Sequence, residues 1–185
     1  MAYDPQEYWK DKPLDIYPAH KDQEVQLLKV LKELNFNSVL EVGCGTGRIS
    51  KLIRDNFQID EYKGIDLSEY RIKEAKNAVN NDPRYSFQVA PFQFMDVQKK
   101  YDLVIAIEVL MHVPPKEFPF VYGKMLGLAE YDVVSLDYSP GKGMEEPLEP
   151  HNFLHDYPSI IQNLPHRVIK ISDKQMIFHV IIDQH

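Results

Sequence analysis

Cysteine, long apolar runs and a leader-like N-terminus are all scarce or missing in this sequence. A single cysteine, Cys44, excludes an internal disulfide and a zinc site built from several cysteines. The most apolar run, LVIAIEVLM, is too short for a membrane span and contains Glu108. The first residues, MAYDPQEYWKDKPLD, have neither the basic start nor the apolar core of a signal peptide. We therefore expect a cytoplasmic protein that does not cross a membrane.

Basic charge is also scarce. Lys and Arg number 21 against 28 Asp and Glu, so the formal net charge is −7. Proteins that bind nucleic-acid backbones rely on many basic contacts to phosphate, so a nucleic-acid partner is not expected. The 185 residues contain no repeats and suit one compact α/β domain, residues 1–185, with residues 1–20 as an N-terminal arm or lid. No metal site is predicted.

The apolar pattern alternates between helix-like and strand-like segments. Helical spacing covers residues 21–34, 49–57, 68–80, the region after Pro114-Pro115 to about Glu130, and 157–164. Strand-like runs cover residues 37–42, 62–66, 85–90, 101–109 and 131–138. Two last runs, 166–172 and 175–182, are separated only by Asp173 and Lys174 and predict an antiparallel hairpin.

This order predicts an α/β fold with a doubly wound, seven-stranded, mostly parallel sheet and a C-terminal antiparallel hairpin. The segment SPGKGMEEPLEPH, residues 139–151, is rich in proline and glycine and predicts a long loop of the kind that often forms a lid. Its carboxylates Glu145, Glu146 and Glu149 either solvate the loop or bind a cationic acceptor.

The stretch EVGCGTGRIS, residues 41–50, places Gly43, Gly45 and Gly47 between a strand and a helix. In a doubly wound sheet, ligands bind beyond the carboxyl ends of the strands, where this turn lies. Glycines let a ligand approach the backbone, and the following helix offers unpaired N–H groups. Arg48 stands where a dinucleotide fingerprint needs glycine, and the Lys-Ser/Thr pair of a phosphate loop is missing. The turn therefore favours a ligand carboxylate over a phosphate.

Asp66 follows the second strand, about twenty residues after the turn, where a carboxylate can accept hydrogen bonds from both ribose hydroxyls. The turn and Asp66 together predict an adenosine-like ligand without an obligatory phosphate.

Three motifs in order resemble those of class I S-adenosylmethionine-dependent methyltransferases. VLEVGCGTGRIS is similar to the family's first motif, GIDLS to its ribose-binding motif and YDLVIAIEVLMHV to its fourth-strand motif. The resemblance covers residues 37–113 and extends to the terminal hairpin. It implies a Rossmann-like methyltransferase fold, S-adenosyl-L-methionine as cofactor and methyl transfer as the activity.

The resemblance also implies roles for individual residues. Glu41 would orient the turn or meet the amino group of the methionine moiety. Glu108 matches the position that faces the methionine moiety and often the acceptor. The family's acidic adenine contact is missing at Ala90, Pro91 and Phe92, so either Asp96 or the backbone near Phe92 would replace it. The implied cofactor-binding set is Glu41, Gly43, Cys44, Gly45, Gly47, Asp66, Leu67, Phe92, Asp96 and Glu108.

Three histidines are candidates for contact with the acceptor. His112 follows the fourth strand, where the family often has histidine, and either contacts ligand or forms structural hydrogen bonds. His151 and His155 are candidate general bases because imidazole titrates near neutrality. Alternatively, His155 and Asp156 cap a helix. Tyr8 and Trp9, in the leading segment, would line the acceptor pocket or belong to an arm that packs in a surface groove.

The sequence therefore predicts a methyltransferase that acts on an oxygen or nitrogen of a small-molecule acceptor. The Asn/Asp-Pro-Pro-Tyr signature of enzymes that methylate nucleobase or glutamine amino groups is absent. A non-catalytic S-adenosylmethionine-binding partner subunit with the same fold is the alternative. A dinucleotide oxidoreductase is disfavoured by Arg48 and by the terminal hairpin.

Overall fold

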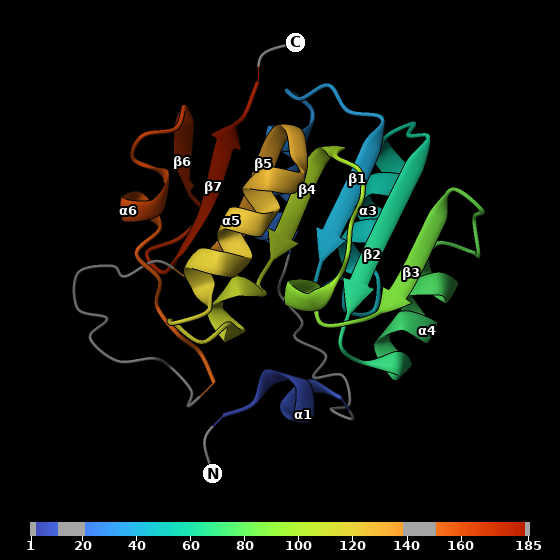
Figure 1. The fold of residues 1–185 in the computed structure, drawn as a ribbon. Helices are drawn as coiled ribbons and strands as arrows, with labels where there is room; N and C mark the ends of the chain where they lie inside the picture. The colour runs from blue at the N-terminus through green and yellow to red at the C-terminus, as the bar shows by residue number, and fades with distance from the viewer. Residues whose placement is uncertain (1–2, 11–20, 139–150, 184–185) are drawn as a thin grey trace.

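The computed structural model describes residues 3–10, 21–138 and 151–183. Seven strands form one sheet with helices on both faces (Figure 1). Residues 139–150 of the loop predicted at 139–151, and residues 1–2 and 11–20 of the predicted N-terminal arm, lie outside the described residues. The elements in chain order are α1 (Pro5–Trp9), α2 (Lys21–Leu31), β1 (Ser38–Val42), α3 (Arg48–Asn56), β2 (Glu61–Asp66), α4 (Glu69–Ala78), β3 (Tyr85–Val89), the 3₁₀ helix η1 (Phe92–Phe94), β4 (Tyr101–Ile107), the 3₁₀ helix η2 (Leu110–His112), α5 (Phe118–Leu128), β5 (Ala129–Tyr138), α6 (Tyr157–Ile161), β6 (His166–Lys170) and β7 (Gln175–Ile181).

The sheet has the strand order β3-β2-β1-β4-β5-β7-β6. Strands β1 to β5 are parallel, and β7 runs antiparallel to both β5 and β6. The predicted fold class, including the C-terminal hairpin, is confirmed. After β3 the chain returns to the other side of β1, so the connections diverge between β1 and β4. Ligands of doubly wound sheets bind at this switch point, beyond the carboxyl ends of the strands.

The core has two layers because successive side chains of a strand point to opposite faces of the sheet. In β4, Val104 and Ala106 pack into the cluster under α5 and α6, whereas Leu103 and Ile105 pack into the cluster under α2 and α3. Figure 1 shows α5 in front of the sheet and α3 behind it. Burial on both faces explains the continuous apolar run of this central strand.

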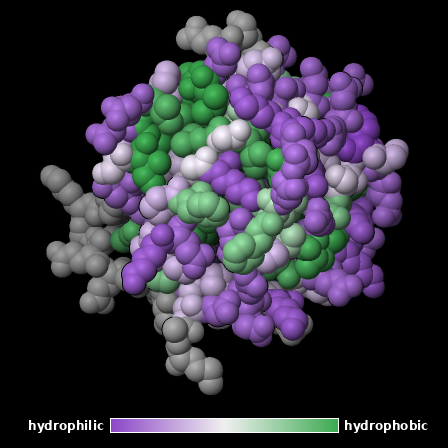
Figure 2. Space-filling view, in the orientation of Figure 1, coloured by the Kyte–Doolittle hydropathy of each residue, from purple (hydrophilic) through white to green (hydrophobic). Residues whose placement is uncertain are grey.

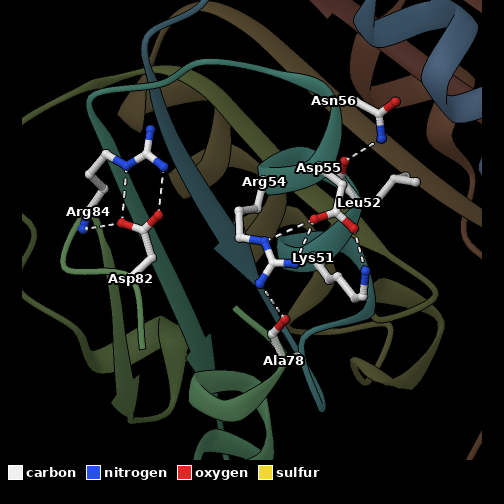
Figure 3. Close-up of polar contacts among 8 residues, drawn as sticks. All are labelled: Lys51, Leu52, Arg54, Asp55, Asn56, Ala78, Asp82 and Arg84. Carbon is white, nitrogen blue, oxygen red and sulfur yellow. Dashed lines mark hydrogen bonds and ion pairs between the residues drawn. The ribbon is translucent and has the colours of Figure 1, made fainter. Parts of the chain in front are cut away.

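Helices α3 and α4 pack closely beside the glycine-rich turn. Gly47 has φ +84°, and a Cβ there would lie 2.8 Å from Ala75 Cα, so the close approach requires glycine. Further along α3, Arg54 Nη1 donates to the Ala78 carbonyl at 3.0 Å and also pairs with Asp55 (Figure 3). The packing of α3 against α4 therefore holds the glycine-rich turn in place.

Several element ends differ from the sequence prediction, and one helix was not predicted. For example, α2 ends at Leu31 instead of 34, β4 at Ile107 instead of 109 and α6 at Ile161 instead of 164. The helix expected to reach about Glu130 ends at Leu128, because Ala129 already pairs with Tyr101 as the first residue of β5. Residues 5–9, for which no regular structure was expected, form α1. Two neighbouring residues favour the start of this helix. The Asp4 side chain caps it by accepting from the Gln6 N–H, and Pro5 occupies the first turn.

Hydrophobic residues reach the surface in separate groups among hydrophilic ones on the face drawn in Figure 2. The exposed large side chains include Phe94 in η1 and Phe120 in α5. Scattered apolar exposure of this kind is ordinary for a folded domain. Among the described residues, every helix is too short or too polar to traverse a bilayer.

Candidate functional site

A cavity of about 1180 Å³ lies at the carboxyl edge of the sheet. It is bordered by the glycine-rich turn, by the ends of β2, β4 and β5, by α1 and by the β6–β7 turn. Of the sequence-predicted site residues, those that line it are Glu41, Gly43, Cys44, Gly45, Asp66, Leu67, Phe92, Glu108, His112 and His151. Segments far apart in the sequence therefore meet at the predicted switch point.

The glycine-rich turn is shaped by a close approach and by one carboxylate. Gly43 has φ +70°, and a Cβ there would lie 2.3 Å from Val109 Cγ2, so the turn needs glycine to pass this side chain. The Gly45 N–H donates to Asp66 Oδ2 at 2.9 Å. A Cβ at Gly45 would meet nothing within 4 Å, which leaves open space for a ligand against this part of the turn.

Asp66 joins the turn to the start of α4. Its carboxylate is 8% exposed and accepts from the backbone N–H groups of Gly45 and Ser68, both at 2.9 Å. An ionised carboxylate has about four lone-pair sites, so two remain after these bonds. The geometry therefore lets Asp66 hold the turn and accept two ligand hydroxyls at the same time.

Glu41 is buried beneath the turn and is already hydrogen-bonded. Its carboxyl group accepts from Ser50 Oγ at 3.0 Å and from the Tyr62 hydroxyl. Burial raises the pKa of Glu41 to about 7, although both hydroxyl bonds act in the opposite direction. These contacts, both made by Oε2, join β1, β2 and α3 and support the orienting role.

Glu108 follows β4 and has an unusual backbone conformation. Its φ is +59°, in the left-handed region that side chains other than glycine rarely adopt. Its carboxylate accepts from Gln23 Nε2 at 2.9 Å and from Gln175 Nε2 at 3.0 Å, both on Oε1. Arg48 Nη2 lies 3.2 Å from Oε2. Strained residues that persist through several specific contacts cluster at functional sites.

Aromatic rings gather at the end of the cavity nearest η2. The rings of Trp9 and His112 lie 4.6 Å apart, as do those of Tyr8 and His151. The His112 and His151 rings stack at 5.3 Å, and His112 Nδ1 lies 3.1 Å from the His151 carbonyl oxygen. Two of the candidate histidines are therefore adjacent, and α1 packs against them.

The remaining predicted residues lie outside this cavity. His155 is 4% exposed, stacks on Phe118 and lies 2.8 Å through Nε2 from the Leu110 carbonyl oxygen. Burial lowers the pKa of His155. Asp96 is exposed, contacts Gln98 and borders a separate, shallow depression. Gly47 serves helix packing, as described above.

Sequence reasoning missed several cavity residues. Gln23 from α2 and Gln175 from β7 converge on Glu108, and Arg71 from α4 lies 4.8 Å from the centre of the Trp9 ring. Arg48 was noticed only as a departure from a dinucleotide motif. Amide side chains carry no sequence signature, and their partners lie 85 and 67 residues away, so the sequence offered no signal for Gln23 or Gln175.

The strand order and the glycine-rich turn at the switch point define a doubly wound, Rossmann-like domain. The family model for the methyltransferase domain matches residues 39–132, about half of the chain. The chain belongs to this methyltransferase-domain family, which confirms the resemblance read from its three motifs.

The relatives matched in sequence are longer proteins. The malonyl-[acyl-carrier protein] O-methyltransferase of Priestia megaterium is 32% identical over 99 residues, which are 51% of this chain and 36% of the relative. The mitochondrial ubiquinone biosynthesis O-methyltransferase of Candida albicans is 31% identical over 97 residues, 50% of this chain and 29% of the relative. This chain thus matches only about a third of the length of these curated relatives.

Solved structures resemble the whole fold. The N-methyltransferase NodS from Bradyrhizobium japonicum WM9, in complex with S-adenosyl-L-homocysteine, has a TM-score of 0.74 to this chain at 14% identity. The similarity covers 95% of each chain. At this identity the likeness concerns the fold alone.

Proposed function

We propose that this chain transfers a methyl group from S-adenosylmethionine to an oxygen or nitrogen of a small-molecule acceptor. The observation that carries the proposal is the turn at Gly43–Gly47 held by Asp66, at the switch point of a methyltransferase-family fold and open to one large cavity. Among the solved structures of similar fold, NodS was captured with S-adenosylhomocysteine and magnesium protoporphyrin IX methyltransferase (ChlM) from Synechocystis PCC 6803 with S-adenosylmethionine.

The residues present fit the donor's adenosine part. Open space beside Gly45 provides room against the backbone, and Asp66 retains acceptor sites for ribose hydroxyls. Leu67 and Phe92 border the cavity and offer apolar contact for a base. Gln93 also borders the cavity and offers an amide group to the base. Asp96 borders a separate depression instead.

The histidine end of the cavity suits the acceptor. A carbonyl oxygen only accepts hydrogen bonds, so the contact with the His151 carbonyl places the proton of neutral His112 on Nδ1. His112 Nε2 then carries a lone pair and can take a proton from an acceptor hydroxyl or ammonium. We assign the general-base role to His112, with Tyr8 and His151 as its aromatic neighbours.

When bound, the donor supplies a sulfonium methyl group that a nucleophile attacks in line with the breaking carbon–sulfur bond. The chain's own contribution is to hold the two reactants together and to exclude water, which can supply much of the acceleration of a displacement. Trp9 and Tyr8 of α1 border the cavity and would cover it on this proposal. The N-terminal arm would thus act as a lid.

The names of the relatives suggest acceptors to test. Several of them are called malonyl-[acyl-carrier protein] O-methyltransferases and one is called an N-methyltransferase. Carboxylates, hydroxyls and amines on small molecules are therefore the first acceptors to examine. We propose a single domain over residues 1–185 that works without a nucleic-acid partner.

The proposal is tested in two stages. Calorimetry with S-adenosylmethionine, S-adenosylhomocysteine and NAD should give heat with the first two and none with NAD. Absence of binding to both sulfur nucleosides would refute it. Release of S-adenosylhomocysteine is then measured with pools of small carboxylates, phenols and amines and with malonyl-acyl carrier protein. Binding without turnover of any pool would favour the non-catalytic partner subunit.

A further inference from the structure

Arg71 is a partly buried cation on the cavity wall that has no charged partner among the described residues. The Lys and Arg side chains that line the cavity there are Arg48, Arg71 and Lys174. Arg48 pairs with the carboxylates of Glu24 and Glu108, and Lys174 is exposed in the β6–β7 turn. Arg71, by contrast, takes part in no ion pair of the described part of the chain, and its Nε is buried without a hydrogen bond.

The Trp9 ring determines which part of the Arg71 guanidinium can bind a ligand. Cζ of Arg71 lies over this ring, 4.8 Å from its centre. Such a cation–π contact uses one face of the planar guanidinium. The N–H donors point outward in the plane of the group, so stacking leaves them for an oxygen acceptor. Because a buried donor without a partner costs free energy, this cavity favours a ligand that carries an oxyanion.

The adenosine part of the methyl donor does not supply this anion. Arg71 lies in the first turn of α4, where its N–H donates to Ser68 Oγ at 3.4 Å. The Ser68 N–H in turn donates to Asp66, the proposed acceptor for ribose hydroxyls. Ribose and adenine are uncharged, and the family resemblance places the donor's amino-acid end near Glu108, after β4. The anion beside Arg71 therefore belongs to the acceptor.

We propose that the methyl acceptor is a small aromatic acid, whose carboxylate binds Arg71 while its hydroxyl or amino group reaches His112. The inference rests on the proposed function, because it names the acceptor class of the same cavity. Arg71 is then a substrate-binding residue. Trp9 orients its guanidinium, and His112 keeps the role of general base.

The distances allow one small molecule to contact both side chains. The Arg71 guanidinium and the His112 ring lie 4.8 and 4.6 Å from the Trp9 ring. Sites for a single small ligand usually have volumes of roughly 300–1,000 Å³. The cavity here has about 1180 Å³, so the donor and a small acceptor can be bound together.

The side chains between Arg71 and His112 suit a flat ring. Trp9, Tyr8 and His151 all border the cavity, and the Tyr8 and Trp9 rings meet edge to face at 4.9 Å. Aromatic rings favour offset or edge-to-face contacts with one another. A cavity with aromatic walls and a few polar groups fixes the orientation of its ligand through those groups. Arg71 and His112 are such polar groups.

The charges of the cavity favour a carboxylate over a phosphate ester. Asp66 and Glu108 line the same cavity, so a second negative charge on the acceptor would be repelled. A phosphate monoester carries about 1.5 to 2 negative charges at neutral pH. A carboxylate carries one, which a single guanidinium can balance through two parallel hydrogen bonds.

The test compares acids with their uncharged carboxamides. The acids are para-hydroxybenzoate, para-hydroxyphenylacetate and para-hydroxycinnamate, in which the carboxylate lies progressively further from the hydroxyl group. Calorimetry measures their binding to the protein saturated with S-adenosylhomocysteine. In at least one pair the acid should bind about tenfold more tightly than its amide, or better, because only the acid forms a charge-assisted pair with Arg71. With S-adenosylmethionine, the same acid should release S-adenosylhomocysteine faster than its amide.

Three variants assign the preference to Arg71. Arg71→Met should lower the affinity for the acid to that for the amide. Loosening of α1 affects both compounds alike, so the ratio of the two affinities reports the charge contact alone. Arg71→Lys keeps the charge without the planar fork and should restore part of the ratio. Lys73→Met is the matched control, because Lys73 is exposed on the same helix outside the cavity, and it should keep the wild-type ratio.

The outcomes separate this inference from the proposed function. If S-adenosylhomocysteine binds but acids and amides bind equally well, or not at all, the acceptor class is wrong while the proposed function stands. Tighter binding of para-hydroxyphenyl phosphate than of every acid would also overturn the carboxylate assignment. A wild-type ratio in Arg71→Met would refute the role of Arg71. A wild type that binds neither S-adenosylmethionine nor S-adenosylhomocysteine would overturn the proposed function itself.

Discussion

At the scale of single residues, Asp66 combines a structural contribution with the proposed binding of ribose hydroxyls. It accepts from the Gly45 N–H, so its loss should loosen the turn as well as remove the acceptor for ribose hydroxyls. We expect Asp66→Ala to weaken S-adenosylhomocysteine by about 1–3 kcal/mol, the usual effect of losing charge-assisted hydrogen bonds. Calorimetry measures the affinity, and Asp60→Ala, an exposed acid outside the cavity, is the control. Unchanged affinity in Asp66→Ala would show that the ribose is held elsewhere.

His112, in η2 after β4, and His155, just before α6, are expected to behave differently. His112→Phe keeps a ring beside Trp9 and removes Nε2, so kcat on an acceptor that must lose a proton should fall about 10²–10⁴-fold with S-adenosylhomocysteine affinity unchanged. His155→Phe should instead lower the melting temperature, because its buried bond to the Leu110 carbonyl is lost, while kcat changes little. Single-turnover rates and thermal unfolding separate the two. Comparable kcat losses in both variants would contradict the assignment of the base to His112.

The sequence could predict those parts of the site that belong to short local motifs. The turn at 43–47 and Asp66 belong to two short motifs with a recognisable spacing, and the structure brings them into hydrogen-bond contact. Glu108 was predicted as a cavity residue, but its partners were not. Gln23, Arg48 and Gln175 approach it only after three elements have folded, and no local pattern encodes that convergence.

At the scale of elements, α1 offers a built-in probe because Trp9 is the chain's single tryptophan. Its ring contacts both Arg71 of α4 and His112 of η2, on two sides of the cavity. We expect S-adenosylhomocysteine to change the emission of Trp9. Arg71→Met should weaken this ligand by about 0.5–1 kcal/mol, because one partly exposed cation–π contact no longer holds α1.

Fluorescence titration measures this effect, with Trp9→Phe as the blank that must lose the signal. A saturating titration, verified by calorimetry, that leaves the emission of Trp9 unchanged would mean that α1 does not sense the donor site.

Elements with a periodic pattern of buried residues were predicted well. Features that depend on helix capping or on pairing with a distant strand were not. The apolar run of β4 is required by burial on both faces, and the pairing of β7 with β5 and β6 follows from the short turn between two strand-like runs. By contrast, α1 has five residues and no buried side chain, so no periodicity could predict it. Its capping residue Asp4 and Pro5 were the only local signal. The end of α5 was set by the pairing of Ala129, a contact from a distant strand.

At the scale of the whole molecule, two buried carboxyl groups support the floor of the cavity. Glu41 joins β1 to β2 and α3, and Asp137 of β5 accepts from the Tyr157 hydroxyl at 2.7 Å and from the Met111 N–H at 3.2 Å. Burial is the main cause of raised pKa values at both: about 7 for Glu41 and about 8 for Asp137. The packed layers beneath the cavity thus hold two carboxyl groups with pKa values near neutrality.

These raised pKa values determine how stability should depend on pH. In the unfolded chain the two carboxyl groups ionise near their ordinary pKa values of 4.5 and 3.8. Between those values and about pH 7 or 8 the native state binds more protons than the unfolded state, so the free energy of unfolding falls as pH rises. The slope is at most about 1.4 kcal/mol per pH unit for each group. We therefore expect a higher melting temperature at pH 5.5 than at pH 7.5.

The neutral variants Glu41→Gln and Asp137→Asn identify the cause. Each removes one titrating group while keeping a side chain that can hydrogen-bond, so each should flatten the decline in the free energy of unfolding measured by urea titration from pH 5.5 to 7.5. The double variant should flatten it further, because the two groups belong to separate networks under β1 and β5. A wild type that is equally stable at both pH values, or variants with the wild-type slope, would show that these carboxyls ionise in the folded protein as they do in the unfolded chain.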